Sequence, residues 1–140
     1  MPLRPLRHAD HALILDSWVK SYRGSPAARR IPDKVYFDHY YQAIRQMLEY
    51  EARNFEVLCA PTDENVIQGW VCSTVECLHY IFIGTAFRGL HLARGLIPKT
   101  ITHYSHFTLA ARPLLEALGC RWAENGLPLV GGPQFDPFQF

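Results

Sequence analysis

The chain has 140 residues and a formal net charge of +1, and 49% of its residues are hydrophobic and 13% aromatic. This composition is enough for the core of one folded domain and argues against a disordered chain. The small net charge creates no overall field that would attract nucleic acid or an anionic membrane, so we expect neither as a partner.

The sequence disfavours two further classes, membrane-spanning and secreted proteins. No run of apolar residues is long enough to cross a bilayer, and the N-terminus lacks the apolar segment of a secretion signal. The cysteines form no Cys-x-x-Cys pair and no cysteine–histidine spacing typical of zinc sites. We therefore expect a cytoplasmic protein with reduced thiols and no bound metal.

The first third of the chain predicts one strand and two helices. Residues 3–7 are typical of a short strand, and Asp10 is placed to cap a helix that runs to Tyr22. A loop over residues 23–32 follows. Asp33 is then placed to begin a second helix, which has one strongly apolar face. The aromatic side chains of both helices recur at helical spacing, which predicts that they lie in the core.

The rest of the chain predicts a sheet interrupted by two short helices. The strands are expected at residues 55–60, 66–75, 76–84 and 99–107, with a final short strand at 121–125. The helices are expected at 90–97 and 108–118, and they are ended by Pro98 and Gly119. This order of elements indicates the α/β class, with a mixed, mostly antiparallel sheet flanked by helices. We expect a single domain over residues 1–140, in which 123–140 form an atypical tail.

A short motif follows the third of these strands. Residues 88–93 read Arg-Gly-Leu-His-Leu-Ala, which resembles the Arg/Gln-x-x-Gly-x-Gly/Ala signature of the GCN5-related N-acetyltransferases. The preceding "YIFIGTAFR" and the downstream "LLEALGCRW" are similar to two further segments of that family. Together the likeness covers roughly residues 3–122. It implies an acyl-CoA N-acyltransferase-like fold that uses acetyl-CoA and an amine acceptor. The general pattern is also similar to small acetyltransferase-like proteins of bacteriophages.

The motif has a physical basis that is independent of the family. The first amides of a helix have no partner within the helix and carry the positive end of its dipole, so they bind anions such as a pyrophosphate. The alternative is an ordinary strand-to-helix turn with two solvated arginines. The cofactor-binding residues that the resemblance implies are Phe82, Ile83, Arg88, Gly89, Leu90, His91, Leu92, Ala93 and Arg94.

Two positions depart from the family pattern. His91 stands where the family has a central glycine. Its side chain crowds the pyrophosphate or demands a less comfortable backbone angle, donates to the pyrophosphate when protonated, or simply lies on a surface turn. Leu115 stands where a tyrosine often protonates the departing thiolate, and leucine cannot donate a proton.

Three residues are candidates for the chemistry. Glu76 is an isolated carboxylate that is either a buried base or a solvated strand-end residue. His79 is either a base or a hydrogen-bonded core histidine. Tyr104, or its neighbour His103, is placed to replace the missing tyrosine as the acid, with a core position as the alternative. Backbone amides near Phe82 and Ile83 are expected to stabilise the oxyanion.

Two functions follow from these observations. The first is transfer of an acetyl group from acetyl-CoA to an amine by direct attack in a ternary complex. The second is a catalytically degenerate acetyltransferase fold that binds another protein, for example a phage protein that targets a host enzyme. His91 and Leu115 motivate the second function, as do the tail aromatics Phe135, Phe138 and Phe140.

Overall fold

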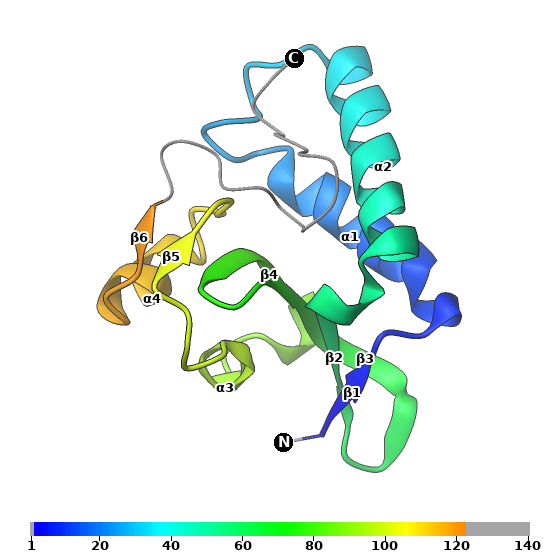
Figure 1. The fold of residues 1–140 in the computed structure, drawn as a ribbon, viewed down its shortest axis with the longest axis vertical. Coiled ribbons are helices and arrows are strands. Elements are labelled where there is room, and N and C mark those ends of the chain that lie inside the picture. Colours follow the sequence, from blue (N-terminus) through cyan, green and yellow to red (C-terminus); the bar gives the residue numbers. More distant parts are fainter. Residues whose placement is uncertain (1, 123–140) are drawn as a thin grey trace.

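A computed structural model of the chain describes residues 2–122 (Figure 1). The predicted tail and its three phenylalanines lie outside the described residues. The strands are β1 Leu3–Pro5, β2 Phe55–Ala60, β3 Asp63–Ser73, β4 Cys77–Ile83, β5 His103–Tyr104 and β6 Arg121–Trp122. The α-helices are α1 His11–Tyr22, α2 Asp33–Tyr50, α3 Leu92–Leu96 and α4 Arg112–Ala117. Single 3₁₀ turns occur at η1 His8–Asp10, η2 Ala52–Asn54 and η3 Thr85–Phe87.

The six strands form one sheet in the order β1-β2-β3-β4-β5-β6. The pairs from β1 to β4 are antiparallel, whereas β4–β5 and β5–β6 are parallel. Helices α1 and α2 lie together on one side of the sheet (Figure 1). The predicted class, a mixed and mostly antiparallel sheet flanked by helices, is confirmed. No helix among residues 2–122 combines the length and the apolar character needed to cross a membrane.

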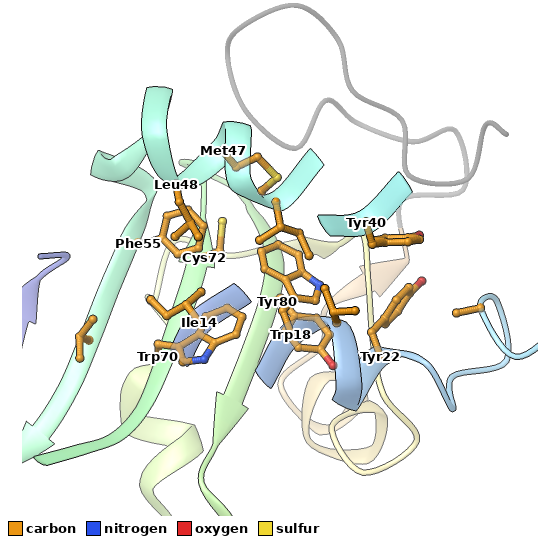
Figure 2. Close-up of a cluster of buried hydrophobic side chains, with 14 of the residues drawn as sticks. Ile14, Trp18, Tyr22, Tyr40, Met47, Leu48, Phe55, Trp70, Cys72 and Tyr80 are labelled. Atoms are coloured by element: carbon orange, nitrogen blue, oxygen red, sulfur yellow. The ribbon is translucent and has the colours of Figure 1, made fainter. Parts of the chain in front are cut away.

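One face of the sheet packs against α1 and α2 through aromatic rings (Figure 2). Ile14, Trp18 and Tyr22 recur every four residues on α1 and are all buried. The Trp18 ring stacks on Tyr80 of β4, with ring centroids 5.0 Å apart and an angle of 6° between the rings. The indole of Trp70 on β3 donates to Ser17 Oγ at 2.9 Å, so its polar atom is satisfied. The prediction that the helix aromatics form core is thus confirmed for Trp18 and Tyr22.

The other face packs against α3, α4 and the segments around them. The buried residues of this second cluster are Leu58, Val71, Leu78, Ile81, Leu96, Ile97, Ile101, Tyr104, Leu115 and Cys120. The sheet is therefore covered on both faces, and β4 contributes to both clusters.

A β-bulge explains how β4 serves both faces. Cys72 pairs with Tyr80 and Ser73 pairs with Leu78, so His79 is an extra residue on β4 without a counterpart on β3. Leu78 and Ile81 then belong to the α3/α4 side, while Tyr80 belongs to the α1/α2 side. The bulge breaks the alternation of side chains along β4 at His79.

Several predicted boundaries differ from the structure. The turn between β2 and β3 is shorter than expected because β3 begins at Asp63. The strand predicted at 99–107 is reduced to His103–Tyr104, because β5 pairs with β4 only at Cys77 and Leu78. The helix predicted from Thr108 begins at Arg112, because Thr108 caps a separate turn by accepting the Ala111 N–H at Oγ1.

Gly119 ends α4 as predicted. Its φ is 77°, and its N–H donates to Glu116 O while the Cys120 N–H donates to Leu115 O, both at 3.0 Å. This pair of bonds is the Schellman motif, which requires a residue that tolerates positive φ.

Asp10 precedes α1 as predicted but does not cap it with its side chain. The carboxylate instead accepts two hydrogen bonds from the Arg4 guanidinium, at 2.7 and 2.9 Å, and one from the Arg7 N–H at 2.8 Å. Burial alone would raise the pKa of Asp10, but these bonds outweigh it and hold the pKa below its usual value. The buried ion pair fixes β1 to the start of α1.

Candidate active site

The site lies where β4 and β5 part. β5 pairs only with the first two residues of β4, so the segment from Tyr80 to Ile83 has no strand on that side within residues 2–122. A cavity of about 330 Å³ opens there. Its walls come from β4, from the loop before α3, from the start of α4 and from Ser21 of α1. The cavity is therefore lined by elements from both faces of the sheet.

The β4 backbone presents alternate peptide groups to this cavity. The Gly84 N–H donates to Gln68 O of β3 at 2.8 Å, so Gly84 and, two residues earlier, Phe82 direct their backbone groups toward β3. Ile81 and Ile83 then direct theirs toward the cavity. Of the two residues expected to supply oxyanion donors, Ile83 directs its backbone groups to the cavity and Phe82 directs its own to β3. Ile81 also directs its backbone groups to the cavity.

The loop from Gly84 to His91 is longer than the tight turn that the sequence suggests. It contains the 3₁₀ turn η3 and two residues with positive φ, Gly89 at 83° and His91 at 59°. Arg88 ties this loop to the end of β4, since its Nε donates to Ile83 O at 3.0 Å and its guanidinium lies 5.7 Å from the Phe82 ring centroid. The guanidinium is thereby held at the cavity.

His91 occupies the left-handed region that the glycine of the family pattern would adopt freely. It is the residue before α3, is exposed and lines the cavity, and its side chain makes no capping hydrogen bond to the described residues of α3. A β-carbon in this region costs about 1–2 kcal/mol. The less comfortable backbone angle expected at His91 is confirmed.

The structure brings most of the predicted cofactor residues together. Those that line the cavity are Phe82, Ile83, Arg88, Gly89, His91, Leu92 and Ala93. Leu90 and Arg94 are exposed and are not among the lining residues. Because α3 is only one turn long, its first residues face the cavity while Arg94 has already turned away.

None of the three predicted catalytic residues is among the described residues that line the cavity. Glu76 was expected within a strand, but it lies exposed in the bend before β4. This bend is at the end of β4 that is farther from the cavity. Tyr104 is 4% exposed and packs in the α3/α4 cluster, edge-on to Phe107. These positions agree with the alternatives given for the two residues, a solvated strand end for Glu76 and a core position for Tyr104.

His79 is a core histidine. It is fully buried, and burial lowers its pKa to about 4. Its Nδ1 is 2.8 Å from Ser105 Oγ, which is also 2.8 Å from His106 Nδ1, and its Nε2 is 3.2 Å from Thr74 Oγ1. A hydroxyl has one proton and two lone pairs, so at least one of the two neutral imidazoles carries its proton on Nδ1 and donates to Ser105 Oγ. This network fixes β4 to the segment after β5.

Sequence reasoning missed two residues of the site, Ser21 and Tyr80. Both line the cavity, and their hydroxyl oxygens are 2.7 Å apart. Burial raises the pKa of the Tyr80 hydroxyl well above its usual range, although the bond to Ser21 acts in the opposite direction. The two residues are 59 positions apart in the chain, so no local pattern could have paired them.

No family model matches the chain, and no curated protein matches it significantly in sequence. Solved structures do match. The apo form of YjaB from Escherichia coli has a TM-score of 0.52 at 17% identity, over 68% of this chain and 60% of that one. A protein from Corynebacterium glutamicum described as histone acetyltransferase HPA2 and related acetyltransferase has a TM-score of 0.51 at 16% identity, over 67% of this chain and 66% of that one.

The matched region spans less than two thirds of the length of both proteins. At this identity the likeness concerns the fold. It agrees with the strand order, with the separation of β4 from β5 and with the motif loop at the resulting cavity. The chain therefore has the fold of the GCN5-related N-acetyltransferases, in a divergent form.

Proposed function

We propose that the protein transfers an acetyl group from acetyl-CoA to an amine by direct attack in a ternary complex. The observation that carries the proposal is the cavity between β4 and β5, which is lined by the motif loop on one side and by α1 on the other. Two substrates can thus approach one point of β4 from opposite faces of the sheet.

The residues present fit acetyl-CoA. Space is open around Gly89, since a β-carbon there would meet no described atom within 4 Å. Arg88 and the first amides of α3 offer positive charge and donors to a pyrophosphate at this end of the cavity. Ile81, Ile83, Leu92, Ala93 and Leu114 form an apolar wall that suits the thioester arm. Acetyl-CoA supplies an acyl group activated as a thioester.

The protein's own contribution is positioning and electrostatics. In this proposal the backbone N–H groups of Ile81 and Ile83 stabilise the oxyanion that develops on the thioester carbonyl. The separated strands hold the two substrates in attacking geometry, which makes the reaction effectively unimolecular. No covalent intermediate with the protein is required.

Binding of acetyl-CoA is expected to raise the melting temperature of the protein. At a concentration of about 100 times Kd, a ligand that binds only the folded state stabilises it by about 2.7 kcal/mol. The measurement is a thermal melt with and without millimolar acetyl-CoA, followed by an assay for CoA release with a panel of amines. A clean melt that does not move at millimolar ligand contradicts the proposal.

Replacing His91 by glycine is expected to tighten CoA binding about fivefold. The change removes a side chain from the cavity, for a gain of about 1 kcal/mol in binding. It also relieves the left-handed strain, which stabilises the folded protein with or without the ligand. Titration calorimetry with CoA measures the effect. Leu90→Ala is the matched control, because Leu90 is adjacent but is not a lining residue. A clear loss of affinity in His91→Gly would instead identify His91 as a phosphate ligand.

A second candidate function is a non-catalytic protein that keeps this fold and binds another protein, for example a phage protein that binds a host enzyme. Leu115 favours it, because this residue is 1% exposed in the core and offers no proton donor where the family has tyrosine. The amine panel separates the two candidates. CoA release above the uncatalysed rate supports the transferase, whereas tight CoA binding without any turnover supports the second candidate.

A further inference from the structure

The hydroxyl pair of Ser21 and Tyr80 is a polar group built into the wall of a largely apolar cavity. The Tyr80 ring is 1% exposed and is held by stacking on Trp18 at 5.0 Å and by edge contact with Tyr22 at 5.8 Å. These contacts fix the direction of the ring, and the hydroxyl meets Ser21 Oγ at 2.7 Å. A buried tyrosine fixed this firmly presents its hydroxyl at one defined point of the cavity.

That point is next to the backbone that would bind the reacting carbonyl. Tyr80 immediately precedes Ile81, whose backbone groups face the cavity. The bulge at His79 produces this arrangement, because it turns the Tyr80 side chain to the α1 side while the Ile81 backbone turns to the gap between the strands. The oxyanion donor and the tyrosine hydroxyl thus come from consecutive residues.

Few other described groups at the cavity can donate a proton to a leaving thiolate. The titratable side chains among its described lining residues are Tyr80, Arg88 and His91. Arg88 and His91 belong to the motif loop, at the end of the cavity assigned to the pyrophosphate. Tyr80 lies on the α1 side, beside Ile81, and carries its hydroxyl proton at neutral pH, since the pKa of a tyrosine is about 10 and burial raises it here.

We propose that Tyr80 is the catalytic proton donor to the departing thiolate and that Ser21 positions its hydroxyl; this inference rests on the proposed transferase function. As the C–N bond forms and the C–S bond breaks, the C–S electron pair moves to sulfur, and sulfur takes the proton of Tyr80 Oη. The phenolate then takes back, through the Ser21 hydroxyl, the proton that the attacking nitrogen releases. The products are an amide and a free thiol, and Tyr80 and Ser21 end the cycle unchanged.

The first test is Tyr80→Phe, which keeps the stacked ring and removes only the hydroxyl. Hydroxylamine serves as the amine, and CoA release is followed by chromatography. The variant is expected to lose about a hundredfold in kcat with little change in the KM for acetyl-CoA. Ser21→Ala is expected to lose less, because the donor remains. Tyr36→Phe is the matched control. It removes the hydroxyl of another buried tyrosine, which donates to Val19 O and does not line the cavity.

The second test does not depend on turnover. A hydroxyl that donates to the sulfur stabilises bound CoA as its thiolate, so wild-type protein is expected to lower the pKa of the bound thiol by about one unit. The measurement is thiolate absorbance against pH, with the complex of desulfo-CoA subtracted to remove tyrosinate absorbance. In Tyr80→Phe the bound thiol is expected to return to the pKa of free CoA.

The outcomes separate the two proposals. If wild-type protein releases CoA no faster than buffer, both the transferase function and the proton donor are overturned. If wild type is active and Tyr80→Phe retains its kcat, or retains the lowered thiol pKa, only the donor is overturned. Loss of kcat in Tyr104→Phe with an unaffected Tyr80→Phe likewise overturns it, in favour of the residue that the sequence suggested.

Discussion

Lowering the pH from 7 to 4 is expected to reduce the free energy of unfolding by about 3 kcal/mol, through His79 alone. Burial lowers the pKa of His79 from 6.5 to about 4, and each pKa unit corresponds to about 1.4 kcal/mol. The pKa of His106 is also lowered, by burial and by its neighbour His79, so its contribution has the same sign.

The direction follows from proton binding in the two states. The unfolded chain protonates these imidazoles below about pH 6.5, whereas the folded protein keeps His79 neutral until about pH 4. Stability is therefore highest above pH 6.5, falls between 6.5 and 4, and levels off for His79 below that range. Protonation is unfavourable because the rings of Trp18 and Tyr22 pack on His106, and Ser105 joins both histidines.

Denaturant unfolding at several pH values between 7 and 4 measures this dependence. In His79→Asn the free energy of unfolding should depend less on pH over that range. Thr74→Val is the control, because it removes the bond to His79 Nε2 and leaves both imidazoles in place. It should lower the stability at every pH and keep the slope. A flat wild-type curve would show that the two histidines are not held neutral.

Replacing Gly69 by alanine is expected to destabilise the protein by about 3 kcal/mol and to weaken acetyl-CoA binding. A β-carbon at Gly69 would lie 2.5 Å from Phe82 O and 2.8 Å from Ile83 Cδ1, which is too close for either. Gly69 lies on β3, between β2 and β4, and pairs with Ile83 of β4. The strain must therefore shift the edge of β4 that lines the cavity.

Gly24→Ala is the matched control for this change. No described atom lies within 4 Å of a β-carbon at Gly24, and its φ is not in the positive range. This variant is expected to be neutral or more stable by up to about 1 kcal/mol. Chemical denaturation and CoA titration of both variants provide the comparison. Equal stability of the two variants would contradict the close packing of β3 on β4.

The sequence anticipated what local patterns encode. The apolar stripe of α1 and α2 follows a 3.6-residue period, and the strands of the hairpins alternate or run apolar, so these elements were found with small boundary errors. The motif loop was also found, because its residues are consecutive and a single turn brings most of them to the cavity.

The rest depended on tertiary structure. The bulge at His79 inserts one residue into a strand that is apolar on both faces, so nothing in its pattern shows where alternation breaks. Residue type alone leaves a catalytic and a core role open for His79 and Tyr104, and the structure buries both side chains. Tyr80 lies inside the strand expected at residues 76–84, where nothing in the sequence distinguishes it, and its partner Ser21 is supplied by packing of α1 on β4.

The short pairing of β5 has a consequence for how the fold assembles and opens. β4 meets β5 through only two residue pairs that are separated by 26 positions in the chain, whereas β2, β3 and β4 form continuous hairpins. Closing that long connection has an entropic cost and gains little strand pairing in return. We therefore expect the antiparallel half to close first and the β5–α4 half to dock last and separate first. The cavity lies on the boundary between these two units, so opening of the docked half widens it without unfolding the helices that cover the aromatic face.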